Sequence, residues 1–263
     1  RGIVVPLFPH LVAPLACFAL IFPCRYLLEE SRRKKIYRIF SYYMDNTVID
    51  SLMNRDIETL LKGEYKDVTV LFLDIRDFTH FSGMHPAEEV VAFLNAFLGR
   101  INEVIISGNG MVNKYIGDGL LAFFWGEQSA RDAVRVAERI VEEAAAMNAD
   151  GTVPGGGSWT LRVGVGIELG RVLMGNIGSE KRMDFTIIGT PVNVASRLEG
   201  LNKLLNTRVL VGPVAAGAAP SEDLVSLGFH PVRGVQGEME VFTPRVPARR
   251  AAVAGVAFKR RGE

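Results

Sequence analysis

The sequence predicts an α+β domain built on a ferredoxin-like β-α-β-β-α-β unit with extra strands. Two observations carry this prediction. Short apolar runs rich in β-forming residues alternate with longer stretches whose apolar residues recur at helical spacing. The order of these segments is also that of the split unit, in which helices cover one face of a mixed sheet. A chain of 263 residues, 48% of them apolar, can bury one such domain plus accessory segments.

The first half of the unit contains a strand, a helix and a hairpin. Residues 68–74 form a short apolar run that predicts the first strand. Pro86 suits the first turn of a helix, whose apolar face is Val90, Phe93, Leu94, Phe97 and Ile101. Residues 111–116 and 120–125 predict two strands around the Gly-Asp-Gly sequence at 117–119, where Asp-Gly indicates a type I′ turn.

The second half continues the alternation. A helix over about 129–147 precedes a flexible Gly-rich loop at 151–158. The remaining elements are predicted in the order strand 161–169, strand 172–177, helix 191–204, strand 208–211 and a last strand closed by Phe242.

The N-terminal residues 1–28 predict a transmembrane helix at the end of a truncated N-terminal region. Between Gly2 and Cys24 there is no Asp, Glu, Lys or Arg, over about the length that a bilayer requires. A basic cluster at 25–38 follows, as the positive-inside rule expects. Four prolines weaken a helix here, so a buried hairpin or the cut end of a larger domain is the alternative. A membrane span implies attachment to the cell inner membrane, with the rest of the chain cytoplasmic.

Three further segments complete the organisation. Residues 29–62 predict a helical linker, 63–246 the main domain, and 247–263 a flexible basic tail. The net charge of +1, without a basic face interleaved with aromatic residues, indicates no nucleic-acid partner. Cys17 and Cys24, both in the apolar stretch, form neither a disulfide framework nor a zinc motif.

Two carboxylates stand where a metal ion would suit them. Asp74 ends the first predicted strand, and Asp118 lies in the turn of the hairpin that returns beside that strand. Facing carboxylates repel each other, and divalent cations relieve the repulsion, which gives the two-metal arrangement used for displacement at phosphorus. The alternative is that both are turn-forming residues.

A third group lies where a strand runs into the predicted helix at 191–204. Asn193 and Arg197 are four residues apart and therefore share a helical face. An arginine can bind phosphate through a two-pronged contact. The alternative is a solvated helix face.

Three segments resemble the signature motifs of class III adenylate and guanylate cyclases. They are residues 72–79, 114–118 and 185–199, in the family's order and spacing. The resemblance covers about 63–246, so the main domain is expected to be a nucleotidyl cyclase catalytic domain. Residues 40–44 and the preceding apolar span also resemble bacterial members in which a membrane-anchored sensor precedes the cyclase.

The resemblance implies a role for each matching residue. Asp74, Ile75 and Asp118 would hold two Mg²⁺ or Mn²⁺ ions, and Ile75, Phe78 and Thr79 would wrap the phosphates. Lys114 and Thr186 would contact the purine ring, and Asn193 and Arg197 would contact the ribose. Arg233 would contact a phosphate. Asn193 and Arg197 would be catalytic, because they orient the ribose and stabilise charge on the transferring phosphoryl group. One departure is Asp77, which stands where the family commonly has glycine.

The implied activity is conversion of ATP to 3′,5′-cyclic AMP and pyrophosphate, in a head-to-tail homodimer that serves intracellular signalling. Lys114 donates hydrogen bonds, which suits the ring nitrogen of adenine and opposes the donor edge of guanine. The alternatives are a guanylate cyclase or a catalytically silent module that binds nucleotide. A diguanylate cyclase is disfavoured, because its hairpin signature is replaced by Tyr-Ile-Gly-Asp-Gly-Leu at 115–120.

Overall fold

The structure is a computed structural model that describes Arg25 and residues 63–155, 159–179, 182–219, 224–235 and 237–245. The chain divides into two compact units, residues 1–57 and 58–263, and the described fold belongs to the second. Apart from Arg25, the predicted membrane span, the linker up to residue 62 and the basic tail lie outside the described residues.

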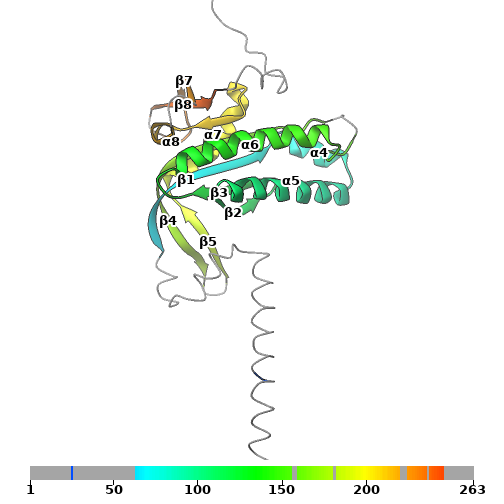
Figure 1. Ribbon diagram of the computed structural model, residues 1–263, viewed down its shortest axis with the longest axis horizontal. Coiled ribbons are helices and arrows are strands. Elements are labelled where there is room, and N and C mark those ends of the chain that lie inside the picture. Colours follow the sequence, from blue (N-terminus) through cyan, green and yellow to red (C-terminus); the bar gives the residue numbers. More distant parts are fainter. Residues whose placement is uncertain are drawn as a thin grey trace, which may run out of the picture. The chain divides into compact units, whose positions relative to one another are not determined.

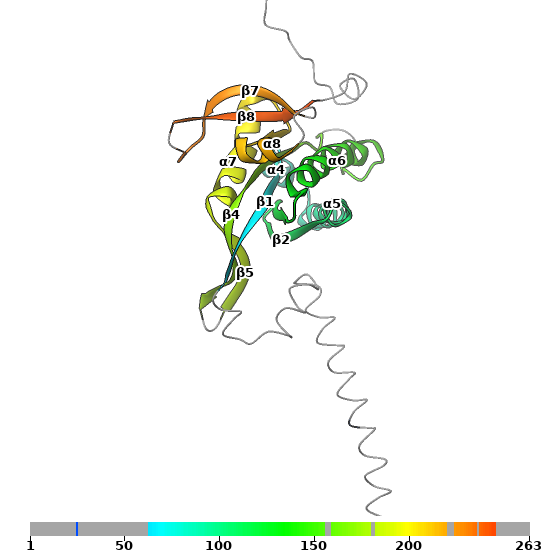
Figure 2. The same cartoon turned by 60° about the vertical axis from the view of Figure 1, so that its left-hand side comes forward.

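The domain is built around an eight-stranded sheet with the order β2-β3-β1-β4-β6-β8-β7, to which β5 is added beside β4 (Figures 1 and 2). The central order β2-β3-β1-β4 is that of the split ferredoxin-like unit, so the predicted fold class is confirmed for this part. The strands are β1 Glu64–Ile75, β2 Gly110–Ile116, β3 Gly119–Phe124, β4 Val163–Ser179, β5 Arg182–Ile188, β6 Val209–Val211, β7 Leu224–Pro231 and β8 Glu238–Pro244.

Helices cover both faces of the sheet. They are α4 Phe78–Met84, α5 Ala87–Ser107, α6 Ser129–Ala149, α7 Thr190–Leu205 and α8 Pro213–Ala218. Alternate residues of β4 show the two faces: Val165 is buried in the core that contains α5 and α6, whereas Gly166 lies against Ala195 of α7. The two helices of the central unit therefore share one face, as expected, and α7 packs on the other.

The main core lies between the sheet and α5 and α6. At one end of it Phe81 of α4 stacks on Trp159 at a ring-centroid distance of 4.4 Å, and Phe93 of α5 meets both rings edge-on. This cluster attaches the short helix α4 to the core. Within the described residues, α5 is the one helix long and apolar enough to cross a membrane, but its Phe93, Phe97 and Ile101 are buried here in the core.

Several elements differ from the sequence prediction. The two strands predicted at 161–169 and 172–177 are one continuous strand, β4, whose first part pairs with β1 and whose second part pairs with β5. Gly170 does not form a turn there; its missing side chain leaves room for Pro191, whose Cγ would lie 2.8 Å from a Cβ. The type I′ turn is also wrong, because φ is positive at Gly117 but not at Asp118, which is the pattern of a type II′ turn. Helices α4 and α8 and strand β7 are not predicted.

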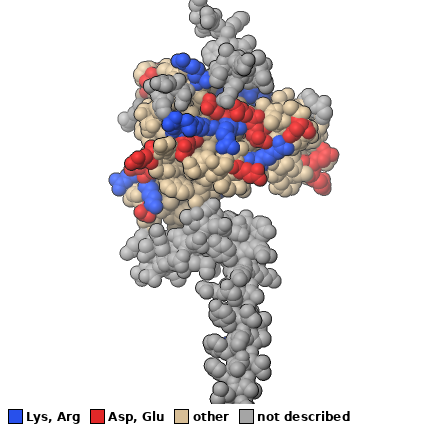
Figure 3. Space-filling view, viewed as in Figure 1, with Lys and Arg blue, Asp and Glu red and all other residues tan. Residues whose placement is uncertain are grey.

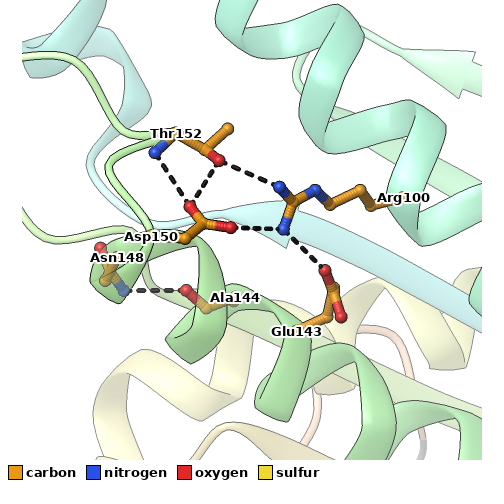
Figure 4. A network of polar contacts seen from close by, with 6 residues as sticks. All are labelled: Arg100, Glu143, Ala144, Asn148, Asp150 and Thr152. Carbon is orange, nitrogen blue, oxygen red and sulfur yellow. Dashed lines mark hydrogen bonds and ion pairs between the residues drawn. The ribbon is translucent and has the colours of Figure 1, made fainter.

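A polar network fixes the loop that follows α6 (Figure 4). Arg100 of α5 donates from Nη1 to Asp150 Oδ2 at 2.8 Å and to Glu143 Oε1 at 3.1 Å, and from Nη2 to Thr152 Oγ1 at 3.1 Å. Hydrogen bonds from Thr152, followed by those from Arg100, lower the pKa of Asp150 to about 2. Lys and Arg are interspersed with Asp and Glu on the face seen in Figure 3.

Gly166 is expected to be the least replaceable residue of the β4–α7 contact. A Cβ at this position would clash with the carbonyl oxygen of Ala195, which is helix backbone and cannot rotate away. Gly166→Ala should therefore destabilise the domain by about 1–3 kcal/mol, measured by urea unfolding. Gly99→Ala is the control: nothing lies within 4 Å of its Cβ position on α5, so alanine should be neutral or stabilising there. Equal stability of Gly166→Ala and the parent protein would contradict this packing.

Candidate active site

The pairing of β1 with β3 places two carboxylates side by side. Leu73 of β1 lies opposite Leu120 of β3, so the turn that contains Asp118 stands next to Asp74 at the end of β1. Gly119 permits this approach, because a Cβ there would lie 3.1 Å from Asp74 Oδ1 and would clash with the carbonyl oxygen of Leu73. Two carboxyl groups distant in sequence are thus held together by the sheet.

The environment of Asp74 opposes its negative charge. Burial, followed by the charge of Asp118, raises the pKa of Asp74 to about 6, although Arg76 acts in the opposite direction. A divalent cation between the two carboxylates would remove this repulsion, so the residues fit a metal site. Across the described residues, no group of three or more His, Cys, Asp or Glu side chains is arranged so that it could hold a metal ion by itself. A cation held by two carboxylates would therefore need water or substrate oxygens as its other ligands.

The two carboxylates line a hollow of about 600 Å³ at the end of β1. The loop that leads from β1 into α4 forms most of its wall, and α7 contributes one side chain near its C-terminal end. The lining residues are Asp74, Ile75, Arg76, Asp77, Phe78, Thr79, His80, Asp118 and Lys203. The structure therefore brings together all five residues to which the sequence assigned metal or phosphate binding through the first two motifs.

An ion pair between Arg76, which lines the hollow, and Glu199 connects the loop to α7. Arg76 Nη2 donates to the carbonyl oxygen of Glu199 at 2.7 Å and lies 2.8 Å from Glu199 Oε1. Gly164 of β4 leaves the space that the guanidinium occupies. Burial raises the pKa of Glu199 to about 7, while the charge of Arg76 opposes this. The end of β1 that carries Asp74 is thus tied to the helix that carries Asn193 and Arg197.

Lys114, the residue predicted to contact the purine, does not line the hollow. Lys114 on β2 forms an ion pair with Asp184 on β5. The predicted partner position, Thr186, instead donates from its hydroxyl to Asn113 Oδ1 at 3.2 Å, and Asn113 Nδ2 donates to the carbonyl oxygen of Phe185 at 3.2 Å. Within one chain, the direct partner of Lys114 is therefore Asp184, two residues before Thr186.

The other predicted residues gather around the outer side of α7. Asn193 is exposed, and Arg197 is half-buried against the turn between β7 and β8. A Cβ on Gly234 in that turn would lie 2.7 Å from Arg197 Nη1, so Arg197 adjoins the turn that contains the exposed Arg233. The structure thus brings the segment of Arg233 to Arg197, although the two are 36 residues apart in sequence.

The predicted site residues therefore form separate groups within one chain. Asp74 and Asp118 line the hollow together with the loop at 75–80, whereas the candidates for purine and ribose binding, and the remaining phosphate candidate, do not line it. These are Lys114, Thr186, Asn193, Arg197 and Arg233. A single chain does not assemble the full set around one cavity.

Four charged residues lie at the hollow or beside the other candidates, although the sequence analysis gave them no role. They are Arg76, Asp184, Glu199 and Lys203. The signal was present for Asp184, because it precedes Thr186 by two residues on a strand and therefore shares its face. Lys203 offers no local signal, since only the packing of α7 on the sheet brings it to the hollow.

Comparison with known proteins identifies the same part of the chain as a known domain. The family described as adenylate and guanylate cyclase catalytic domain matches residues 60–243. An adenylate cyclase of Anabaena cylindrica is 33% identical over 186 residues, covering 69% of this chain and 37% of that protein. The chain thus spans only about a third of the length of this relative.

Solved structures include cyclases of both substrate classes. A bacterial light-regulated adenylyl cyclase has a TM-score of 0.72 at 27% identity, covering 86% of this chain and 65% of that one. The guanylyl cyclase Cya2 has a TM-score of 0.61 at 28% identity, covering 72% of this chain and 98% of that one. Because the family match spans well over half of the sequence, this chain belongs to the adenylate and guanylate cyclase catalytic domain family.

Proposed function

We propose that this protein is an adenylate cyclase, which converts ATP to 3′,5′-cyclic AMP and pyrophosphate for intracellular signalling. The observation that carries the proposal is the pair Asp74 and Asp118 at a hollow that is bounded by the loop at 75–80. This loop resembles the family segment that surrounds the phosphates. In this reaction the ribose 3′-oxygen attacks the α-phosphorus, and pyrophosphate leaves. Positioning and charge stabilisation dominate such phosphoryl transfers, so the chain needs no nucleophilic side chain.

Each residue group has a distinct task in this proposal. Asp74 and Asp118 hold two Mg²⁺ or Mn²⁺ ions, assisted by the backbone at Ile75. Bound metal ions would lower the pKa of the 3′-hydroxyl and neutralise charge on the phosphates. Phe78 and Thr79, which line the hollow, would surround the phosphates.

The second group serves the other end of the nucleotide. Lys114 and Thr186 would contact the adenine ring, and Asn193 and Arg197 the ribose and the α-phosphate. Arg233 would contact a phosphate, since its turn lies against Arg197.

A head-to-tail homodimer would join these groups into complete sites. The separation of Lys114 and Arg197 from the hollow within one chain supports this arrangement. Two-fold symmetry makes the two sites equivalent, because each protomer contributes its hollow to one site and its α7 to the other. Control of pairing would then control activity.

Preference for ATP over GTP rests on Lys114. Its ammonium group can donate to the adenine ring nitrogen, and its neighbour Asp184 can accept from the adenine amino group. The adenylate cyclase of Anabaena cylindrica agrees with this preference. The similarity to the guanylyl cyclase Cya2 keeps guanylate cyclase activity as the second candidate, and a silent nucleotide-binding module as the third. Purified full-length protein with Mg²⁺ or Mn²⁺ and either ATP or GTP distinguishes the three by the cyclic nucleotide formed.

Membrane attachment through residues 1–28 completes the proposal, with the catalytic domain on the cytoplasmic side of the cell inner membrane. Its support is the uncharged stretch from Gly2 to Cys24 and the basic cluster after it.

Arg197→Ala should lower turnover with ATP by about 100-fold or more, because a charge-stabilising donor is lost from the transition state. Asp74→Asn should do so as well, through loss of metal binding. Mixing the two variants provides the sharper test. A heterodimer has one site with both changes and one site with neither, so random pairing should restore about a quarter of parental activity. Absence of any recovery, with heterodimers shown by native mass spectrometry, would contradict shared sites.

The Mg²⁺ requirement should depend on pH. Since the pKa of Asp74 is raised to about 6, protons compete with the cation below that value. The Mg²⁺ concentration for half-maximal activity should rise as pH falls from about 7 to 5, by up to about tenfold per unit. Activity measured across Mg²⁺ concentrations at each pH tests this. A half-maximal concentration that stays constant over this range would argue against Asp74 as a ligand.

A further inference from the structure

Asp77 occupies a special backbone position beside the hollow. It lies between β1 and α4 with φ 57° and ψ 28°, in the left-handed region that favours Gly, Asn and Asp. Although it stands at the N-cap of α4, its side chain makes no capping hydrogen bond. Helix capping, the ordinary role of an aspartate here, therefore does not account for this carboxylate.

The Asp77 carboxylate instead faces two cations. Arg162 donates from Nη2 to Asp77 Oδ2 at 2.8 Å, and Lys203 Nζ lies 3.9 Å from Asp77 Oδ1. The two contacts differ in strength. The guanidinium makes a charge-assisted hydrogen bond, whereas the ammonium group is at the outer limit of an ion pair, on a side chain that is 73% exposed.

Both Asp77 and Lys203 line the hollow that contains Asp74 and Asp118. A polyphosphate bound there would meet an ammonium group that can move and a carboxylate that repels it. Lys203 sits on a flexible four-carbon stem and can exchange one anionic partner for another at little cost.

We propose that Lys203 is a polyphosphate-binding residue and that Asp77 is the anion that competes for it. In the free site Lys203 pairs with Asp77; when a nucleoside triphosphate binds, Lys203 transfers to a phosphate oxygen. Asp77 thereby weakens retention of the pyrophosphate product and speeds its release. The identity of the ligand rests on the proposed cyclase function, whereas the competition between Asp77 and phosphate does not.

The backbone of Asp77 allows two matched substitutions. Asp77→Asn keeps the size and the left-handed conformation while removing the charge, and Asp77→Gly keeps the backbone freedom without a side chain. Binding of pyrophosphate with Mg²⁺ to the full chain is measured by isothermal titration calorimetry. Both substitutions should tighten binding by about two- to fivefold, the range expected for exposed charge pairs. Lys203→Met should weaken binding by a similar factor.

The double variant tests the transfer of Lys203. If Asp77 acts by holding Lys203, then Asp77→Asn should tighten binding much less in the Lys203→Met background than in the parent. Asp132→Asn is the control: it removes a carboxylate on α6 that bonds Asn109 away from the hollow, and binding should not change. In turnover assays Asp77→Asn should also increase inhibition by added pyrophosphate.

Each outcome separates this inference from the proposed function. Unchanged or weaker pyrophosphate binding in both Asp77 variants, with normal thermal unfolding, overturns the role of Asp77. Equal tightening with and without Lys203 overturns the transfer and leaves simple repulsion. Pyrophosphate binding that responds as expected, without any cyclic nucleotide from ATP or GTP, supports the inference while refuting the cyclase activity.

Discussion

The antiparallel pairing of β1 with β3 is the constraint on which the site depends. Buried residues such as Leu71 and Leu73 fix the register of this pair, since a shift by one residue would turn every core side chain outward. The same register puts Asp118 beside Asp74. Hydrophobic burial therefore holds two carboxyl groups at a separation that their charges oppose. Burial, followed by the charge of Asp118, raises the pKa of Asp74, and a divalent cation bound between the two carboxylates would relieve their repulsion.

Helix α7 connects the residue groups that one chain keeps apart. Its inner side packs closely on β4 because Gly166 has no side chain, and Glu199 on this side forms an ion pair with Arg76, which follows β1. Asn193 is exposed on the same helix, and Arg197 meets the turn between β7 and β8. A displacement of α7 would thus act on both the hollow and the proposed ribose contacts. In a symmetric pair of chains, this helix would belong to both sites.

Much of the fold follows from local sequence patterns. The central unit, helices α5, α6 and α7, and the β2–β3 hairpin were predicted from periodicity and turn residues, with ends off by a few positions. The continuity of β4 was not, because Gly170 looks like a turn residue until the packing of Pro191 against it is known. Short elements such as α4 and α8 have too few residues for a periodic signal.

The candidate site likewise contains residues that the sequence predicts and residues that it does not. The resemblance identified residues that lie in the three family motifs, and the structure places Asp74 and Asp118 together as expected. It could not identify partners that depend on tertiary contacts. The pairing of Lys114 with Asp184 joins β2 to β5 across 70 residues, and Lys203 reaches the hollow only because α7 packs on the sheet. The raised pKa of Asp74 likewise depends on burial that no motif records.

The aromatic cluster that packs against α4 makes Trp159 an intrinsic fluorescent probe of this helix. Of the two tryptophans, Trp159 is stacked on Phe81, whereas Trp125 is half-exposed beyond β3. Phe81 lies one turn after Phe78, which lines the hollow. Any rearrangement of the loop between β1 and α4 that rotates α4 would alter the stacking of Phe81 on Trp159. Its emission would then report from within the core on events at the surface, without an attached dye.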